Sequence, residues 1–260
     1  MIFKERIFMA AAVVTGASSG IGRETAIMLS KKGYDLILVA RDRAELAKTA
    51  RMSKTHCTIA ALDLSVRENC YKLYEKTKYM DIEVLVNNAG FGVFGEFTES
   101  PLDKQLNMLD LNVGALHTLT YLYLRDMQKK DKGYILNVAS MAAFAPGPLL
   151  SGYYACKSYV YSLTRAAAHE LKRDGSNVKI SLLCPGPVNT NFNSRAGVNF
   201  SIKPISAKRC AAAGLNGMFK GKSVIIPGLF NKFTVLAMKL LPQDVVMDGC
   251  YWVQNRKKKV

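Results

Sequence analysis

Hydrophobic positions in the chain form short apolar runs that alternate with longer segments carrying apolar residues at helical spacing. The short runs are rich in Val, Ile and Leu, which is typical of buried parallel strands, and the longer segments predict amphipathic helices between them. This alternation indicates βα units that build a parallel sheet. The seven predicted strands lie at residues 8–14, 35–40, 57–62, 84–87, 133–138, 178–183 and 223–226.

Local chemistry predicts two helix ends. Ser65 and Glu68 form the Ser-x-x-Glu pattern of a capping box, so a helix is expected to begin at Ser65. Gly33 follows Lys31 and Lys32, whose charges suit the negative end of a helix dipole. The first helix is therefore expected to end there.

The chain shows no internal repeat, low-complexity tract or Pro/Gly-rich linker that would divide its 260 residues. We therefore expect a single domain over residues 1–260, with dinucleotide and catalytic sites in one unit. One segment, residues 189–206, loses periodicity and mixes Asn, Ser, Gly and Lys with large apolar residues. Because such a length is unusual for a loop in a compact domain, we expect a substrate lid there, with a disordered insert as the alternative.

The formal net charge is +16, from 36 Lys and Arg against 20 Asp and Glu. This field would attract a phosphorylated cofactor, an anionic substrate, a membrane surface or nucleic acid, or it would serve only solubility. Nucleic acid is not the expected partner, because the basic residues are not interleaved with aromatic residues on a stripe. The run 230–241 carries Lys232 and Lys239 among apolar residues, which fits either peripheral membrane binding or a helix at a subunit interface.

Six cysteines and three histidines show no spacing typical of a metal site, so no metal is expected and the cysteines are interpreted as reduced core residues. The apolar stretch 7–14 is too short for a signal sequence. No apolar run approaches the ~20 residues that a membrane-spanning helix needs. These features predict a cytoplasmic protein without a transmembrane segment.

A glycine-rich turn follows the first predicted strand. Residues 15–22 read Thr-Gly-Ala-Ser-Ser-Gly-Ile-Gly, and a helical run begins at once. Glycines at such a turn let a pyrophosphate approach the backbone amides at the positive end of the helix. A spaced set of glycines alone is a weak signal, but this position between a strand and a helix predicts a dinucleotide site.

Three motifs together resemble the short-chain dehydrogenase/reductase family: the Gly-x-x-x-Gly-x-Gly turn, the segment Asn87-Asn88-Ala89-Gly90, and the Pro-Gly-x-Val-x-Thr pattern at 185–190. The resemblance implies a single-domain Rossmann fold, in which a doubly wound seven-stranded parallel sheet carries helices on both faces. It also implies a homodimer or homotetramer.

The family's cofactor-binding positions are transferred only where the motifs match. By resemblance, Asp63 would contact adenine, Asn87 and Gly90 would support the sheet and border the adenosine, and Pro185 to Thr190 would lie beside the nicotinamide carboxamide. A simple turn is the alternative explanation for these prolines and glycines. The full set of expected cofactor-binding residues is Gly16, Ser18, Ser19, Gly20, Ile21, Gly22, Arg41, Asp63, Leu64, Asn88, Ala89, Gly90, Tyr153, Lys157, Pro185, Gly186, Val188 and Thr190.

Charge at the end of the second predicted strand discriminates between the two nicotinamide cofactors. An acid there would bond a free ribose diol and repel a 2′-phosphate, whereas an arginine would attract the phosphate. Ala40 stands where the acid is usual and Arg41 follows it, so NADP(H) is expected, with Arg41 and Ser18 near the phosphate. Asp42 leaves NAD(H) open, because a modest backbone shift would bring its carboxylate to the ribose.

A candidate proton donor lies on the helix after the fifth predicted strand. A tyrosine has an ordinary pKa near 10, so it needs a nearby cation to exchange protons at neutral pH. Tyr153 and Lys157, four residues apart, share one helix face, where the ammonium would stabilise the phenolate. A packing tyrosine beside a snorkelling lysine is the alternative. Tyr154 is the weaker candidate, because the residue four positions after it is Ser158, which supplies no positive charge.

The resemblance gives each remaining catalytic residue a role. Ser140 precedes Tyr153 by the family's spacing and would hold the substrate oxygen, while Lys157 would lower the tyrosine pKa and bind the nicotinamide ribose. Asn112 matches the asparagine that bends its helix and holds a water for proton relay. Its alternative is a polar residue misplaced in an apolar helix. With Arg41 at the second strand, the resemblance implies an NADP-dependent oxidoreductase acting on CH–OH donors.

The expected substrate pocket is apolar, which favours a bulky hydrophobic ketone or alcohol such as a hydroxysteroid. A 3-oxoacyl thioester is the alternative, because its anionic carrier would use the positive surface, and a general carbonyl reductase is another. Ordinary loop packing is the other interpretation of these side chains. The expected lining residues are Phe91, Val93, Met141, Phe144, Leu149 and, on the lid, Phe192 and Phe200.

Overall fold

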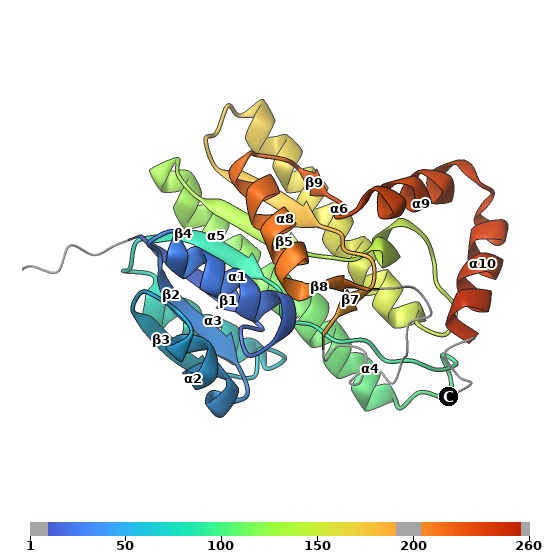
Figure 1. Ribbon diagram of the computed structural model, residues 1–260, viewed down its shortest axis with the longest axis horizontal. Coiled ribbons are helices and arrows are strands. Elements are labelled where there is room, and N and C mark those ends of the chain that lie inside the picture. The colour runs from blue at the N-terminus through green and yellow to red at the C-terminus, as the bar shows by residue number, and fades with distance from the viewer. Residues whose placement is uncertain (1–9, 191–203, 256–260) are drawn as a thin grey trace, which may run out of the picture.

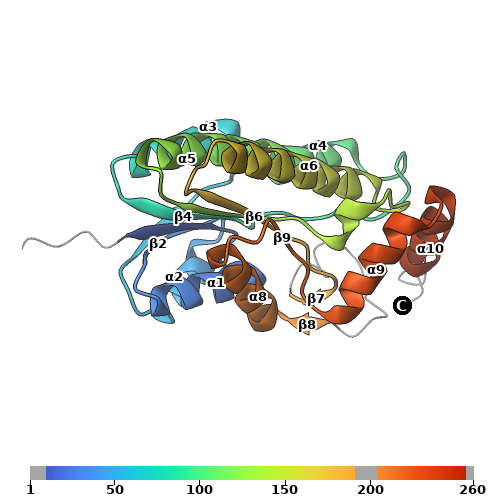
Figure 2. The same cartoon turned by 90° about the horizontal axis from the view of Figure 1, so that it is seen from above.

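Seven parallel strands form one sheet between two layers of helices (Figures 1 and 2). The computed structural model describes residues 10–190 and 204–255. The strands follow the order β3-β2-β1-β4-β5-β6-β9. Their bounds are β1 Ala11–Thr15, β2 Asp35–Ala40, β3 Cys57–Ala61, β4 Ile82–Asn87, β5 Tyr134–Val138, β6 Lys179–Leu183 and β9 Val224–Ile225. This sheet confirms the predicted doubly wound Rossmann fold, including all seven strands.

Helices cover both faces of the sheet, because strand side chains alternate between the faces and both sets are apolar. Val13 and Ile135 belong to the core under one helix layer, and Val14 and Leu136 belong to the core under the other. The first layer contains α3 (Arg67–Thr77), α5 (Leu116–Lys130) and α6 (Ser151–Arg173), and the second contains α1 (Gly20–Lys31), α2 (Arg43–Arg51) and α8 (Ala207–Phe219). Figure 2 shows the two layers on opposite sides of the sheet.

The strand order reverses around β1, which pairs with β2 on one side and β4 on the other. Helical connections from β1 and β4 therefore leave on different faces, and a crevice opens at the carboxyl ends of these strands. The fold places a ligand site at this position.

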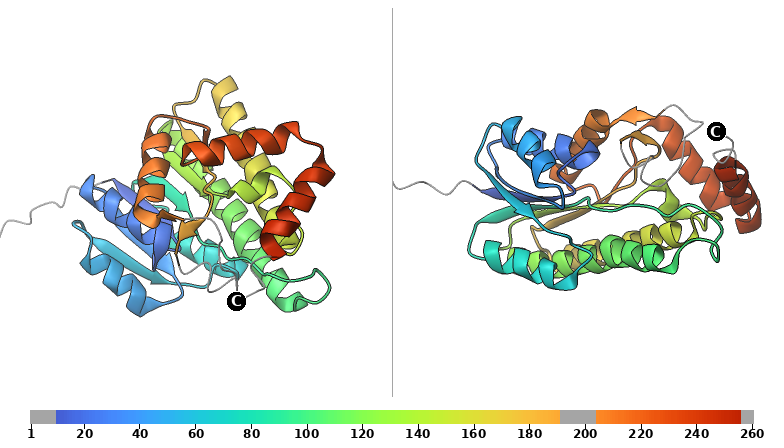
Figure 3. Two further views of the ribbon diagram at one scale, coloured as in Figure 1. Left: turned by 45° about the vertical axis from the view of Figure 1, so that its right-hand side comes forward. Right: turned by 90° about the horizontal axis from the view of Figure 1, so that it is seen from below.

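Two further helices extend past the carboxyl ends of the strands. They are α9 (Leu229–Leu240) and α10 (Gln243–Asn255), which lie at the edge of the molecule (Figure 3). None of the helices in the described parts of the chain has the length and apolarity needed to cross a membrane.

Short strands join the two ends of the predicted lid. β7 (Val188–Asn189) pairs in parallel with β8 (Ile205–Ser206), an arrangement that the sequence did not predict. Residues 191–203 between them lie outside the described residues. The substrate lid at 189–206 therefore stays a prediction.

One predicted helix end is confirmed and the other is wrong. Helix α1 ends at Lys31, and Gly33 follows with a left-handed φ of 93°. The capping box at Ser65 does not form, because α3 begins at Arg67 without a side-chain cap. The Ser65 hydroxyl instead donates to Asp63 Oδ1 at 2.7 Å, since a carboxylate is a strong acceptor nearby.

Candidate active site

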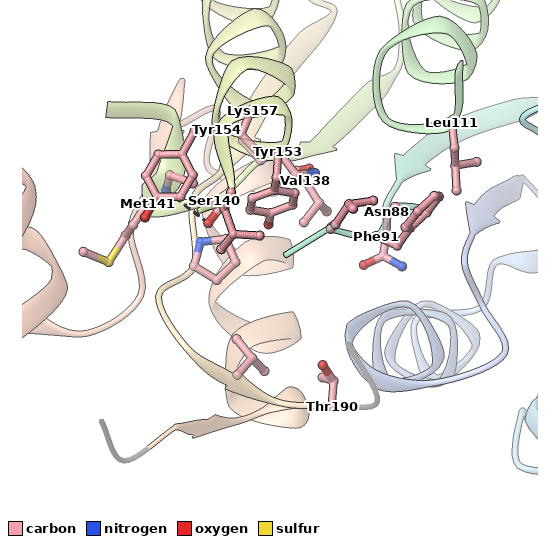
Figure 4. Close-up of a pocket in the computed structure, with 18 of the residues that line it drawn as sticks. Asn88, Phe91, Leu111, Val138, Ser140, Met141, Tyr153, Tyr154, Lys157 and Thr190 are labelled. Carbon is pink, nitrogen blue, oxygen red and sulfur yellow. Dashed lines mark hydrogen bonds between the residues drawn. The ribbon is translucent and has the colours of Figure 1, made fainter. Parts of the chain in front are cut away.

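A cavity of about 1560 Å³ opens at the carboxyl ends of the strands. It exceeds the ~300–1000 Å³ of ordinary small-molecule pockets, so it has room for a dinucleotide and a substrate together. Figure 4 shows part of its wall, with side chains from the β5 end, α6 and the turn after β4 converging on one space.

The glycine-rich turn after β1 forms one end of the cavity. Gly16 and Gly20 have left-handed φ angles of 65° and 55°. A Cβ at Gly16 would lie 2.6 Å from Asn88 Nδ2, and a Cβ at Gly20 would lie 2.9 Å from Thr190 Cγ2. Side chains are therefore excluded from the turn for both conformational and steric reasons.

Helix α1 begins at this turn with its amides directed to the cavity end. Its N-cap residue, Ser19, makes no side-chain capping hydrogen bond. The first amides of a helix attract anions when no cap side chain satisfies them. Ser18, Ser19, Gly20 and Ile21 line the cavity here, so these residues fit a pyrophosphate.

Gly22 does not line the cavity, in contrast to the other predicted residues of the turn. A Cβ at Gly22 would lie 2.2 Å from the carbonyl oxygen of Gly16. Gly22 therefore lets the helix pack on its own entry turn, and its effect on a cofactor is indirect.

The turn after β4 is bonded to the turn after β1. Thr15 Oγ1 accepts from the amides of Asn88 at 2.9 Å and Ala89 at 3.0 Å, and Asn88 Nδ2 donates to the Thr15 carbonyl oxygen at 3.1 Å. These bonds hold two cavity-lining turns in register across the crevice. Thr15 therefore supports the cofactor end of the cavity, a role that the sequence motifs did not predict.

Asn87 is separate from this turn and does not line the cavity. It is buried, and its Nδ2 donates to Asn137 Oδ1 at 2.9 Å and Thr120 Oγ1 at 3.0 Å. The expectation that Asn87 borders the adenosine is therefore wrong, while its sheet-supporting role is consistent with these bonds. Gly90, by contrast, lines the cavity.

Three charged residues surround the cavity wall near β2 and β3. Arg41 lines the cavity and is largely exposed, with Nη1 3.8 Å from Asp63 Oδ2. Asp42 caps α2, where its Oδ1 accepts from the Glu45 amide at 3.0 Å. The Asp42 carboxylate is therefore already engaged at a helix end, whereas the ion-pair partner of the Arg41 guanidinium among the described residues, Asp63, is distant and lies on the surface. Leu64 lines the same part of the wall.

Tyr153, Lys157 and Ser140 converge at the other end of the cavity (Figure 4). Tyr153 and Lys157 are buried on one face of α6, with Lys157 Nζ 5.6 Å from the centroid of the Tyr153 ring. Lys157 Nζ donates to the Val138 carbonyl oxygen at 2.9 Å. Ser140 caps a 3₁₀ turn, Met141–Phe144, and its side chain hydrogen-bonds with Tyr153. The spacing thus brings all three residues together.

Burial governs the protonation of this cluster. It raises the pKa of Tyr153 to about 12, against a smaller lowering by the hydrogen bond to Ser140. Burial also lowers the pKa of Lys157 to about 8. Lys157 is not among the causes of the shift at Tyr153, so the expected lowering of the Tyr153 pKa by Lys157 stays a prediction. The phenol is protonated at neutral pH.

Asn112 lies in a π-helical segment, Asp110–Ala115, between α4 (Leu102–Leu109) and α5. Its Nδ2 donates to the Phe91 carbonyl oxygen at 2.8 Å, and its Oδ1 accepts from the Phe91 amide at 3.0 Å. Asn112 is buried and does not line the cavity. The helix irregularity expected at Asn112 is present, and the two bonds explain a polar residue inside an apolar helix.

Only some of the apolar residues predicted to line the substrate pocket do line the cavity. Phe91, Val93 and Met141 line the cavity, whereas Phe144 and Leu149 do not. Phe144 packs edge-on against the ring of Tyr161 at 5.1 Å, with Lys239 Nζ 5.5 Å from its centroid. Leu149 is buried elsewhere, and its neighbour Leu150 lines the cavity instead. Phe192 and Phe200 lie outside the described residues.

Pro185, Gly186, Val188 and Thr190 line the cavity, as expected from the motif after β6. The sequence did not predict the part of the cavity wall that lies beyond these residues. It comes from α9, from Leu241 just after it, and from α10, and includes Thr234, Ala237, Met238, Leu241, Val245, Val246, Gly249, Cys250, Val253 and Gln254. Gln254 Nε2 donates to the hydroxyl of Tyr154 at 2.9 Å, which ties α10 to α6. No motif marks these residues, and only the amphipathic pattern at 230–241 signalled a functional surface.

A glycine-lined helix terminus and a buried Ser-Tyr-Lys cluster at one switch-point cavity define the class of Rossmann-fold, dinucleotide-dependent oxidoreductases. Residues 10–199 match the sequence profile described as short chain dehydrogenase. The chain belongs to this family of oxidoreductases.

Two relatives illustrate the similarity in sequence. A very-long-chain 3-oxoacyl-CoA reductase from Coprinopsis cinerea is 36% identical over 172 residues, which cover 63% of this chain and 51% of the fungal protein. The match thus spans about half the length of that relative. An uncharacterized oxidoreductase from Staphylococcus epidermidis is 34% identical over 184 residues, covering 69% of this chain and 78% of the bacterial protein.

A solved structure illustrates the similarity in fold. The short-chain dehydrogenase from Sphingobium yanoikuyae in complex with NADPH has a TM-score of 0.79 and 27% identity to this chain. The superposition covers 90% of this chain and 97% of that one.

Proposed function

We propose that the protein is an NADP(H)-dependent oxidoreductase that interconverts a bulky hydrophobic ketone and its secondary alcohol, with a hydroxysteroid as the favoured class. The observation that carries the proposal is the convergence of Ser140, Tyr153 and Lys157 in the same cavity as the uncapped start of α1. Both requirements of carbonyl reduction, a dinucleotide site and a proton donor, therefore meet in one space.

A nicotinamide held at the cavity would supply the hydride for the carbonyl carbon. Tyr153 donates the proton that the carbonyl oxygen needs, and its pKa of about 12 keeps the phenol protonated at neutral pH. Ser140 holds the same oxygen through its hydroxyl. In the oxidative direction the phenol must release its proton, and a charged Lys157 stabilises the phenolate across the helix turn.

The choice of NADP(H) rests on charge at the end of β2. Arg41 and Asp42 both line the cavity. Arg41 offers an exposed cation there, whereas the Asp42 carboxylate accepts the Glu45 amide at the start of α2. The Arg41–Asp63 pair opposes phosphate binding only weakly, because an exposed ion pair is worth about 0–1 kcal/mol. The NADPH complex of the Sphingobium relative supports the same choice. NAD(H) is the alternative cofactor.

The substrate class follows from the wall opposite the dinucleotide end. Phe91, Met141 and Leu150 meet apolar residues of α9 and α10 there, so a rigid apolar ketone is accommodated better than a sugar. A 3-oxoacyl thioester is the second candidate. It is favoured by the name of the Coprinopsis relative and by Lys104, a cation that lines the cavity. General carbonyl reduction is the broadest alternative.

The test is a substrate panel with both cofactors. Purified protein is mixed with NADPH or NADH and with oxosteroids, 3-oxoacyl thioesters or small ketones, and the loss of reduced-nicotinamide absorbance is followed. Tyr153→Phe should abolish turnover, because it removes the proton donor. Tyr159→Phe is the matched control and should retain kcat, because Tyr159 lies on the same helix, is exposed and does not line the cavity. Turnover that survives in Tyr153→Phe would refute the proposed mechanism.

A further inference from the structure

Arg23 lies in the first turn of α1, just after the glycine-rich turn at the dinucleotide end of the cavity. It is not among the residues that line the cavity. Its guanidinium instead joins three groups. Nη2 donates to the Ser18 carbonyl oxygen and, at 2.7 Å, to Glu45 Oε2, while Nε donates to Thr49 Oγ1 at 3.2 Å. One side chain thus connects the turn after β1 with helix α2.

The contact with Ser18 holds the backbone of the glycine-rich turn. Thr49 is fully buried on α2, and its Oγ1 donates to the carbonyl oxygen of Ala17 at 2.9 Å. Two successive carbonyl groups of the turn, those of Ala17 and Ser18, are therefore held by side chains from α2 and α1. Because Ser18 and Ser19 both line the cavity, these bonds determine where the two serines lie.

The contact with Glu45 reaches the wall segment at the end of β2. Asp42 caps α2, and its Oδ1 accepts from the Glu45 amide at 3.0 Å. Arg41 and Asp42 both line the cavity there. Hydrogen bonds through Arg23 and Glu45 therefore connect this wall segment to Ser18, on the same side of the sheet as α1 and α2 (Figure 2).

The pair of Arg23 and Glu45 is ionised and partly buried. Hydrogen bonds from Lys48 and from Arg23 lower the pKa of Glu45, so its carboxylate is charged at neutral pH. Bonds between ionised groups are shorter and stronger than neutral ones. An arginine also holds several acceptors in a fixed planar geometry. The contact is therefore suited to keeping two segments of backbone at a set distance.

We propose that Arg23 is a positioning residue for recognition of the 2′-phosphate of NADP(H). It sets the distance between Ser18 on the glycine-rich turn and Arg41 at the end of β2, so that both reach the same phosphate. The inference rests on the proposed function, because it takes the preference for NADP(H) from there. It adds a residue that acts on the phosphate only through the backbone of the turn and the start of α2.

Equilibrium binding of the two nucleotides tests this role without any substrate. NADPH or NADH is titrated into full-length protein, and each Kd is measured by nucleotide fluorescence and by calorimetry. Arg23→Met should weaken NADPH binding about tenfold and NADH binding by less than about threefold, because the phosphate needs both segments in place. Arg23→Lys should restore part of the NADPH affinity, since an ammonium holds Ser18 or Glu45 but lacks the planar fork that holds both.

Lys48→Met is the matched control. It removes one positive charge and a partner of the same Glu45 carboxylate, but in the described part of the chain Lys48 donates to no residue of the glycine-rich turn. The ratio of the two Kd values should therefore stay within about twofold of the wild-type ratio.

A double variant, Arg23→Met with Arg41→Ala, separates positioning from an independent contribution. If Arg23 acts by placing the groups that bind the phosphate, the loss of NADPH affinity in the double variant should be smaller than the product of the two single losses. Losses that multiply would contradict the positioning role. Thermal unfolding checks that each variant is folded, and if Arg23→Met does not fold, Arg23→Lys should still lose NADPH affinity selectively.

Two further outcomes would overturn the inference. Equal losses for NADPH and NADH in the Arg23 variants, or no loss for either, would leave Arg23 a structural contact only. A Lys48→Met protein that loses as much NADPH affinity as Arg23→Met would assign the effect to net charge. Wild-type protein that binds both nucleotides equally would contradict the choice of NADP(H) itself. Wild-type preference for NADPH that persists in Arg23→Met would contradict the role of Arg23 alone.

Discussion

At the scale of single residues, Arg41 and Arg43 are close in sequence and carry the same charge, but their surroundings differ. Arg41 lines the cavity, whereas Arg43 at the start of α2 is exposed outside it. Charge alone therefore does not select the phosphate-binding residue. Position at the end of β2, on the cavity wall, is the reason that we propose Arg41 for this role.

Arg41→Ala should raise the KM for NADPH by roughly 10–100-fold, because it removes a charge-assisted hydrogen bond worth about 1.5–3 kcal/mol. The KM for NADH should change by less than about threefold, since a free ribose diol offers that cation no phosphate. Steady-state kinetics with both cofactors give these values. Arg43→Ala is the control, and equal losses for the two cofactors in Arg41→Ala would contradict the phosphate role.

Lys157 is the residue at which burial acts most directly on stability. Its pKa in the folded protein is about 8, against an ordinary value of 10.5. Between these pH values the unfolded chain holds a proton that the folded chain has released, so stability rises with pH there. Below about pH 8 both states are protonated and the full penalty for burying the charge applies. Tyr153 acts in the opposite direction only above its ordinary pKa of 10.0.

Lys157→Met should therefore stabilise the protein without a ligand at about pH 7, by up to about 3 kcal/mol, and should lose this advantage by about pH 11. Urea unfolding of wild type and variant across this range measures the difference. Lys72→Met, on the exposed face of α3, is the matched control. A constant difference across the range would show that the buried ammonium does not set the pH dependence.

At the scale of elements, the sequence predicted those strands and turns that depend on residues close together in the chain. The seven strands followed from apolar runs, and the site turns followed from residues whose chemistry depends on their immediate neighbours, such as Gly16 and Gly20. Asn87 and Phe144 were misplaced because their side-chain direction depends on packing against α5 and against Tyr161. The walls from α9 and α10 were missed because they meet α6 through contacts between residues such as Tyr154 and Gln254, which are far apart in sequence.

The junction of β1 and α1 gives an element-scale prediction. Gly22→Ala would place a Cβ 2.2 Å from the Gly16 carbonyl oxygen, so the turn or the helix must shift. We expect a loss of about 1–3 kcal/mol in unfolding free energy, together with weaker NADPH binding. Denaturant unfolding and titration with NADPH measure the two effects.

Gly114→Ala is the control for this junction, because a Cβ there meets no heavy atom within 4 Å. It should be neutral or stabilising by about 0.5–1 kcal/mol, the usual gain when alanine replaces glycine in a helical backbone. A Gly22→Ala protein as stable as the wild type would contradict the packing role of Gly22.

At the scale of the whole molecule, the cavity joins parts of the chain that are remote in sequence. Its wall includes Gly16 near one end, Tyr153 in α6 and Val253 in α10. The net charge of +16 on the chain should speed the encounter with a polyphosphate at low salt. The predicted homodimer or homotetramer and the cytoplasmic location stay predictions at this scale.

A ligand that binds across such a cavity should stabilise the entire fold, because unfolding of any wall destroys the site. At a concentration about 100 times its Kd, NADPH should add about 2.7 kcal/mol, which corresponds to a rise in Tm of roughly 5–10 °C. Thermal unfolding with NADPH and with NADH at equal concentration measures this. An equal rise with NADH would contradict the phosphate assignment and leave the dinucleotide site intact. No rise with either cofactor would contradict the site itself, because the glycine turn, α6 and α10 would then not share a ligand.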